Sequence, residues 1–171
     1  MSIPADNPKI EVKKTKYKGL GVFATKNIKK GEIISTFNGG KVLKAKRCNY
    51  LPIKPENIRD HTVQFGEEEY MYNSKTLAQL LNHSCNPNCG IKNLFDLVAT
   101  KNIKKGEELN WDYEMTEDSD WRLKCKCGSK SCRHIIGAHN LMPKNLKKKY
   151  KGYISDWLVK KYNQKNRIIS K

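Results

Sequence analysis

Residues 82–88 read Asn-His-Ser-Cys-Asn-Pro-Asn and place an amide, an imidazole, a hydroxyl and a thiol at consecutive positions. Asn, Ser and Pro in such a run are also typical of a polar turn, so this stretch alone leaves a turn and a chemical site equally open. Features elsewhere in the chain therefore have to decide between the two interpretations.

Three cysteines lie close together near the end of the chain, in the run KCKCGSKSC at residues 124–132. Cys125, Cys127 and Cys132 supply three of the four ligands that a tetrahedral structural zinc site requires. Cys85 and Cys89 are both candidates for the fourth ligand. Because the cysteines are clustered and no secretion signal precedes them, thiolates on a metal are favoured over disulfides.

Two further segments carry candidate chemistry. Residues 108–113 read ELNWDY, a strand-like stretch that ends in an acid and a phenol, so Tyr113 is a candidate catalytic residue. A buried structural tyrosine is the alternative. Gly19 and Gly21 would let the backbone approach a ligand closely, although paired glycines are also typical of a turn.

Taken in order, these segments resemble the SET-domain protein lysine methyltransferases. Gly19 to Ala24, the NHSCNPN run, the ELNWDY run and the late cysteines match the family's glycine segment, its N-H-S-C-x-P-N and E-L-x-x-D-Y motifs and its post-SET zinc loop. From Cys125 onward the chain is most similar to compact stand-alone SET proteins of the kind seen in bacteria. The resemblance implies a mainly β, β-rich α+β fold of small curved sheets with a pseudoknot. The expected organisation is a SET domain over residues 1–120 with a variable insert at about 41–60, a post-SET zinc loop over 121–137 and a basic helical tail over 138–171.

The resemblance also implies methyl transfer from S-adenosylmethionine to a lysine of a histone or another basic protein, with one structural zinc ion. It assigns cofactor binding to Lys18, Gly19, Leu20, Gly21, Thr62, Asn82 and His83, the lysine channel to Tyr70, Tyr72 and Trp111, catalysis to Tyr113, and zinc binding to Cys85, Cys125, Cys127 and Cys132. Thr62 stands where many members have Tyr. Trp111 stands where the family often has Phe or Tyr, so we expect di- or trimethylation.

Composition limits the partners. The 171 residues fit one domain, and no apolar run approaches the roughly 18 residues of a membrane span. We expect an intracellular monomer, cytoplasmic in a bacterium and nuclear if it acts on eukaryotic histones. The net charge is +17, and residues 122–171 hold fifteen Lys or Arg against one Asp. That basic tail predicts contact with nucleic acid or nucleosomes, with a merely solvated surface equally open.

Acidic residues stand out against this background. Residues 67–69 are three glutamates, and the run from Asp112 to Asp120 holds further acids beside the proposed site. Both groups are predicted to attract a lysine-rich peptide, although ordinary acidic loops would look the same. Two alternatives to an enzyme remain: a non-catalytic SET-like chromatin module, and a zinc-stabilised nucleic-acid binder, for which no recognition helix or stacking series is evident.

A nine-residue sequence occurs twice. Residues 24–32 and residues 99–107 both read ATKNIKKGE, and each copy stands between apolar, strand-like residues. We interpret each copy as a strand, a turn at the glycine and a second strand, so that the same turn is used twice. Residues 76–81 are predicted to form one or two helical turns, and a last helix is predicted to begin near Ser155 and to pack on the domain.

Overall fold

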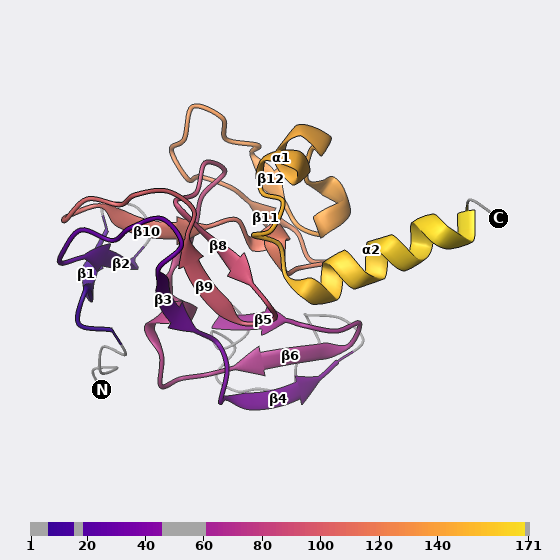
Figure 1. Ribbon diagram of the computed structural model, residues 1–171, viewed down its shortest axis with the longest axis horizontal. Helices are drawn as coiled ribbons and strands as arrows, with labels where there is room; N and C mark the ends of the chain where they lie inside the picture. The colour runs from indigo at the N-terminus through magenta and orange to yellow at the C-terminus, as the bar shows by residue number, and fades with distance from the viewer. Residues whose placement is uncertain (1–6, 16–18, 46–60, 170–171) are drawn as a thin grey trace.

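The computed structural model describes residues 7–15, 19–45 and 61–169 (Figure 1). Short strands dominate it, which confirms the predicted mainly β class. The strands are β1 (Ile10–Lys14), β2 (Leu20–Ala24), β3 (Ile33–Thr36), β4 (Lys41–Lys44), β5 (Thr62–Gln64), β6 (Glu69–Tyr72), β7 (Asn82–His83), β8 (Cys89–Lys92), β9 (Asp96–Ala99), β10 (Glu108–Trp111), β11 (Leu123–Lys124) and β12 (Ile135–Ile136). Lys18, Cys48 and most of the predicted insert lie outside the described residues.

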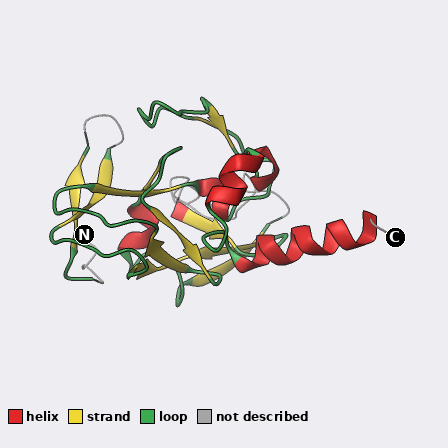
Figure 2. Ribbon diagram, turned by 45° about the horizontal axis from the view of Figure 1, so that its top comes forward, coloured by secondary structure: helices red, strands yellow, loops and turns green. Residues whose placement is uncertain are grey.

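Helices are few and lie mostly near the C-terminus. Within residues 7–15, 19–45 and 61–169, three are short 3₁₀ helices and two are α-helices: η3 (Leu77–Leu80), η4 (Tyr113–Met115), η5 (His139–Leu141), α1 (Lys144–Lys149) and α2 (Asp156–Ile169). Figure 2 shows α1 and α2 on one side of the strands. None of the helices in the described ranges has both the length and the apolar character needed to cross a bilayer.

The sheet that carries the site has the strand order β1-β2-β10-β7. Strand β2 pairs antiparallel with β1 and β10, whereas β7 runs parallel to β10 and sets Asn82 beside Asn110 and His83 beside Trp111. Parallel neighbours cannot be joined by a tight turn, so this pairing unites segments that are distant in the sequence. The NHSCNPN run thereby lies against the strand that leads into Tyr113.

Asn88 strengthens the junction between these segments. Its side-chain amide donates to the Glu108 carbonyl oxygen at 2.8 Å, and its Oδ1 accepts from the Asn110 amide at 3.0 Å. Asn88 is buried, so these hydrogen bonds satisfy a side chain that would otherwise be costly to remove from water. The last residue of the run therefore has a structural role at the β7–β10 crossing.

Two further sheets have three strands each and are antiparallel, with the orders β3-β9-β8 and β4-β6-β5. Strands β11 and β12 pair as a small antiparallel ladder. The main hydrophobic core collects fully buried side chains from the first two sheets, including Val22, Ile91, Leu97 and Leu109. Alternation along β2 and β10 directs these side chains inward, as the period of two in a half-buried strand requires.

The C-terminal helix packs on the domain as predicted. Trp157 and Leu158 of α2 belong to the main core, and the Trp157 indole donates to the Thr116 carbonyl oxygen at 2.9 Å. Ser155 directly precedes α2, and its hydroxyl donates to the Leu94 carbonyl oxygen at 3.4 Å. Removing a buried Trp side chain typically costs about 3–5 kcal/mol, so α2 is an integral part of the domain.

Candidate active site and metal centre

A pocket of about 500 Å³ opens beside the β7–β10 junction. This volume lies within the roughly 300–1,000 Å³ of small-molecule sites in proteins. Five of the residues predicted for the site line it: Leu20, Thr62, Asn82, Trp111 and Tyr113. The pairing of β7 with β10 thus brings both motifs to one cavity.

Asn82 holds the glycine segment against this pocket. Its Nδ2 donates to the Leu20 carbonyl oxygen and to Glu108 Oε1, both at 2.9 Å. A Cβ on Gly21 would lie 3.0 Å from Asn82 Nδ2 and from Glu108 Oε1, which is too close for an unshifted side chain. Gly19 has φ of 76°, a conformation that L side chains rarely adopt. A side chain at either glycine would therefore strain the local structure.

Tyr113 stands between the pocket and the cysteines. Its hydroxyl donates to the Leu81 carbonyl oxygen at 3.1 Å, and its backbone N–H donates to His83 Nδ1 at 3.3 Å. Its ring lies 5.1 Å from that of Trp111, 5.3 Å from that of His83 and 6.3 Å from that of Trp121, measured between centroids. The phenol is therefore held in a fixed orientation by contacts on several sides.

Aromatic side chains form much of the remaining wall. Phe37 packs on Trp111 with ring centroids 5.6 Å apart, and Trp121 also lines the pocket. Tyr70 and Tyr72, which the resemblance assigns to the lysine channel, belong to a small cluster on the β4-β6-β5 sheet that contacts Trp121. In the described part of the chain neither tyrosine forms the pocket wall, so their contact with this site runs through Trp121.

The predicted cysteines gather on the far side of Tyr113. Cys85 and Cys125 have their sulfurs 3.8 Å apart, and ligand atoms of these two, Cys127 and His83 all lie within 4.8 Å of one another. Cys132 packs against the same group. Burial opposes ionisation of Cys127, but hydrogen bonds from backbone N–H groups and neighbouring thiols lower its pKa to about 7. A thiolate is accordingly accessible near neutral pH.

The spacing of these sulfurs fits a metal. Zinc–sulfur bonds of about 2.3 Å at tetrahedral angles separate two sulfurs by about 3.8 Å, whereas a disulfide would bring them to about 2.05 Å. The distance between Cys85 and Cys125 matches the first value. Cys89 lies outside the group, since its thiol donates to Asn88 Oδ1 at 3.3 Å. Of the two candidates for the fourth cysteine, the geometry favours Cys85.

The imidazole of His83 contacts both Tyr113 and Cys85. Because Nδ1 accepts from the Tyr113 N–H, the neutral ring carries its hydrogen on Nε2, which faces Cys85 Sγ at 3.3 Å. The imidazole therefore points to the cysteines and away from the pocket. The resemblance assigns His83 to cofactor binding, and that assignment stays a prediction. The side chain instead links Tyr113 to the metal centre.

A buried ion-pair network ties the cysteine loop to the pocket. Asp112, which is completely buried, accepts two hydrogen bonds from the Arg133 guanidinium at 2.6 and 2.8 Å. Glu114 lies 3.4 Å from the same guanidinium, and its Oε1 accepts from the Gly137 N–H at 3.0 Å. Breaking one partner of such a pair typically costs about 3–5 kcal/mol. Residues on both sides of Tyr113 are thus clamped to the residue that follows Cys132.

The carboxyl groups of Asp112 and Glu114 share the Arg133 guanidinium, and this makes the stability of the protein depend on pH. Burial, and then the nearby Asp112 charge, raise the pKa of Glu114 to about 7, with Arg133 acting in the opposite direction. Between its usual pKa near 4.5 and pH 7 the folded protein therefore binds a proton that the unfolded chain releases. The stability that this proton contributes is fully present below pH 4.5 and is lost as the pH rises through 7.

The neutral variant Glu114→Gln tests this pKa. We expect the melting temperature of the wild type, minus that of the variant, to fall as the pH is raised from 5 to 8. The reason is that only the wild type must bury a carboxylate above pH 7. Both proteins carry the same cysteines, so metal binding cancels in the difference. A difference that stays constant over this range would show that the pKa of Glu114 is not raised.

Internal contacts neutralise much of the acidic charge that was predicted to attract a peptide. Lys161 of α2 pairs with Glu67 at 2.8 Å and with Asp118 at 2.6 Å, and the Tyr162 hydroxyl donates to Asp118 at 2.8 Å. The acids on either side of Tyr113 pair with an arginine. Glu117 does line the pocket, where burial raises the pKa of its carboxyl group. Glu67 and Asp118 therefore anchor α2, and Asp112 and Glu114 anchor the cysteine loop.

Several residues of the pocket wall were not among the predicted ones. Phe37, Thr116, Glu117 and Trp121 line the cavity, and Arg133 supports it from behind. Trp121 and Arg133 flank the cysteine run, so their position beside the predicted metal centre was a usable signal. Phe37, Thr116 and Glu117 reach the pocket through tertiary packing, which no local sequence pattern predicts.

The pattern of the SET domain matches residues 19–114 of the chain. Among curated proteins, "Histone-lysine N-methyltransferase ASHR3" of Arabidopsis thaliana is 27% identical over 147 residues, covering 79% of this chain and 29% of the relative. "Histone-lysine N-methyltransferase 2B" of Homo sapiens is 31% identical over 134 residues, covering 69% and 5%. The chain thus spans less than a third of the length of these relatives.

Solved structures show the same likeness. The methyltransferase domain of human histone-lysine N-methyltransferase SETMAR superposes with a TM-score of 0.58 at 26% identity, covering 75% of this chain and 58% of that domain. KRYPTONITE, in a complex with mCHH DNA, an H3(1-15) peptide and SAH, superposes with a TM-score of 0.52 at 23% identity, covering 74% and 29%. The second likeness concerns the fold alone.

Proposed function

The chain belongs to the SET-domain family, and from this membership we propose that it is a protein-lysine N-methyltransferase that uses S-adenosylmethionine. One observation carries the proposal: the pairing of β7 with β10 puts Asn82 and Tyr113 on the wall of one pocket. The first residue is assigned to the cofactor and the second to the reacting amine. The curated relatives reported above are named as histone-lysine N-methyltransferases, which supports the reaction class.

The pocket residues fit S-adenosylmethionine. Leu20, Thr62 and Asn82 would form the walls around it, and the absence of a side chain on Gly21 lets Asn82 and Glu108 pack closely against the glycine segment. When bound, the cofactor supplies a methyl group on a positively charged sulfur. The presence of SAH in the KRYPTONITE complex is in keeping with this choice.

The variant Gly21→Ala is expected to weaken cofactor binding about tenfold. The added carbon would lie 2.7 Å from Thr15 Cγ2 and would also push on Asn82 Nδ2 and Glu108 Oε1, each 3.0 Å from it. Losing one or two hydrogen bonds costs about 1–2 kcal/mol. Calorimetric titration with S-adenosylmethionine measures the dissociation constant. Gly66→Ala is the control, because its added carbon would meet only the side chain of Glu69, whose Oε2 is the nearest atom at 2.6 Å, and would not touch Asn82. Equal dissociation constants for Gly21→Ala and the wild type would exclude this role for Gly21.

On the substrate side, the target lysine must lose its proton before it can attack. Keeping an amine of pKa near 10.4 neutral at pH 7 costs about 4–5 kcal/mol in water, and a desolvating environment reduces that cost. Phe37, Trp111 and Trp121 provide apolar ring surface for this purpose. The Tyr113 hydroxyl, held by Leu81, would orient the amine toward the methyl carbon, and such alignment lowers the barrier without a covalent intermediate.

We assign structural zinc to Cys85, Cys125, Cys127 and Cys132, with His83 donating to the Cys85 thiolate. A hydrogen on Nε2 leaves that nitrogen no lone pair for a metal, which supports Cys132 as the fourth ligand. Zinc content, measured by mass spectrometry of the purified protein, tests this assignment. Cys132→Ser should lose zinc while His83→Gln retains it, and the reverse result would make His83 the ligand.

The substrate class that we propose is a lysine in a histone or another basic protein. The decisive experiment incubates the protein with labelled S-adenosylmethionine and histones, nucleosomes or cell lysate, and then maps the modified residues by mass spectrometry. The same spectra report the number of methyl groups, which we expect to be two or three because Trp111 offers no phenol. Labelling that does not exceed that of a Tyr113→Phe control would remove the enzyme and leave a non-catalytic SET-like binding module.

A further inference from the structure

The two ATKNIKKGE copies pair with each other. Ile28 and Ile103 form an antiparallel bridge in which each backbone N–H donates to the other's carbonyl oxygen at 2.9 Å. The side chain of Asn27 accepts from the Lys105 N–H at 3.0 Å, and that of Asn102 accepts from the Lys30 N–H at 2.9 Å. Each of these contacts between the copies is thus repeated by the equivalent residues of the other copy.

The ends of the two copies also form equivalent backbone hydrogen bonds. Ala24 N–H donates to the Glu107 carbonyl at 3.0 Å and its carbonyl accepts from Gly106 at 2.7 Å. Ala99 makes the matching pair with Glu32 at 3.0 Å and Gly31 at 2.8 Å. Reciprocal bonds between equivalent atoms define a local two-fold axis, which passes between the two bridging isoleucines. An exact repeat in the sequence has therefore become a symmetric unit in the fold.

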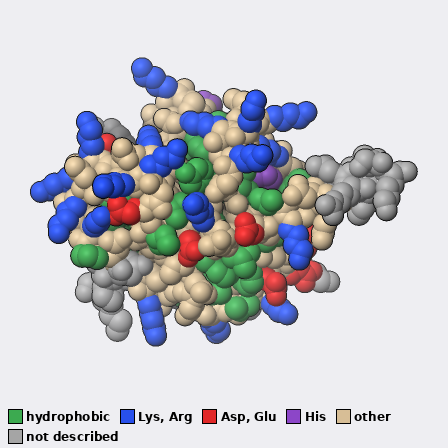
Figure 3. All heavy atoms as spheres, in the orientation of Figure 1, with side chains coloured by type: hydrophobic (Ala, Val, Ile, Leu, Met, Phe, Trp, Pro, Cys, Tyr) green, Lys and Arg blue, Asp and Glu red, His purple; other side chains and the backbone are tan. Residues whose placement is uncertain are grey.

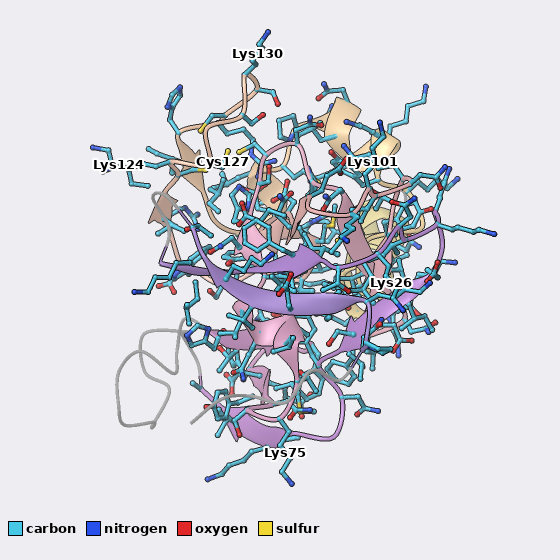
Figure 4. The ribbon with its side chains drawn as sticks, turned by 90° about the vertical axis from the view of Figure 1, so that its left-hand side faces the viewer. Lys26, Lys75, Lys101, Lys124, Cys127 and Lys130 are labelled. Carbon is cyan, nitrogen blue, oxygen red and sulfur yellow. The ribbon has the colours of Figure 1, made fainter. Side chains whose placement is uncertain are left out.

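This symmetric unit presents six lysines to solvent. They are Lys26, Lys29, Lys30, Lys101, Lys104 and Lys105, and all are exposed. Among the described residues none of the six takes part in an ion pair, whereas Glu32 of the first copy already pairs with Lys9. Figure 4 shows Lys26 and Lys101 on the same side of the molecule, and Figure 3 shows basic side chains gathered over the end that carries the two turns.

We propose that this paired-repeat surface binds the phosphate backbone of double-stranded DNA. Six exposed, uncompensated cations supply the counterion release that dominates such binding. The two-fold arrangement selects a duplex, because the two strands of a duplex are themselves related by local two-fold axes and symmetric binding units match them. Each copy would then contact one strand. A disordered single strand or a lipid surface offers no such symmetry.

The surface is separate from the pocket. None of the six lysines lines the cavity, and both turns are built by their own backbone hydrogen bonds. DNA binding would therefore survive changes that abolish methyl transfer, such as Tyr113→Phe. Its failure in the experiment below would leave the proposed enzyme untouched.

The test measures fluorescence anisotropy of a labelled 20-base-pair DNA duplex with the full chain between 50 and 200 mM NaCl. With six phosphates neutralised we expect a slope of log K against log salt of about −5, hence a loss of roughly 10³-fold in affinity over this range. Lys26→Gln/Lys29→Gln/Lys30→Gln removes one copy's cations, and Lys101→Gln/Lys104→Gln/Lys105→Gln removes the other's. Each triple variant should reduce the slope by about 2.7, leaving a loss of only about 40-fold.

A third triple variant, Lys144→Gln/Lys148→Gln/Lys151→Gln, removes the same charge from exposed positions near α1. It should keep the wild-type slope within about one. The proposal fails if this control loses as much as the repeat variants, or if the two repeat variants differ from each other. It also fails if a single strand of equal length or a phosphatidylserine vesicle binds as tightly as the duplex. Circular dichroism melts verify that all variants are folded.

Discussion

The variant Cys125→Ser is expected to abolish methyl transfer and to release residues 121–136 from the body of the protein. Cys125 is buried, its sulfur lies 3.8 Å from that of Cys85, and its N–H donates to the His134 carbonyl at 2.7 Å. Structural zinc contributes about 10–16 kcal/mol to the folding of small zinc-dependent units, so loss of one ligand should unfold this loop. Because Trp121 comes from the loop, one wall of the pocket would be lost with it.

Three measurements follow this variant: zinc content, methyl transfer with labelled cofactor, and hydrogen exchange over residues 121–136. Cys89→Ser serves as the matched control, because Cys89 is buried outside the cluster and a serine hydroxyl can make the same hydrogen bond to Asn88. The control should keep its zinc and its activity. Full zinc content and activity in Cys125→Ser would exclude the metal centre as the organiser of this loop.

Local chemistry made the fold predictable in part. Residues 82–88 and 108–113 carry side chains that a turn and a strand do not need, and the resemblance to the SET domain implied that the two stretches meet in a pseudoknot. In the structure, the parallel pairing of β7 with β10 brings these two stretches together. The repeat also predicted two similar turns, but their reciprocal pairing could not be anticipated, since it depends on how the chain between them folds.

The sequence could not show which charged residues form ion pairs with residues far away in the chain. Asp112 was counted among the acids predicted to attract a peptide, and in the structure it binds Arg133 from the cysteine loop. Lys161 was read only as part of a basic tail, yet it neutralises Glu67 and Asp118. Net charge along a sequence does not show which charges pair, because pairing depends on contacts between residues far apart in the chain.

Tyr113→Phe is expected to reduce kcat about 10²-fold or more while leaving the cofactor dissociation constant and zinc content near their wild-type values. The hydroxyl's hydrogen bond to Leu81 is worth only about 1 kcal/mol to folding, so the protein should stay folded. In the proposed reaction, however, the same hydroxyl orients the amine, and loss of alignment at the reacting atoms costs far more than loss of stability. The expected signature is a large change in kcat with a small change in melting temperature.

Tyr153→Phe provides the comparison for this result. Tyr153 packs partly buried against the main core, does not line the pocket, and loses the same single oxygen on substitution. Initial rates at saturating cofactor and peptide, together with calorimetric titration of the cofactor, separate the two variants. Equal rates for both would show that the phenol of Tyr113 has a structural role only. A Tyr113→Phe protein that has lost zinc would instead trace the defect to His83, which joins the Tyr113 backbone to the Cys85 thiolate.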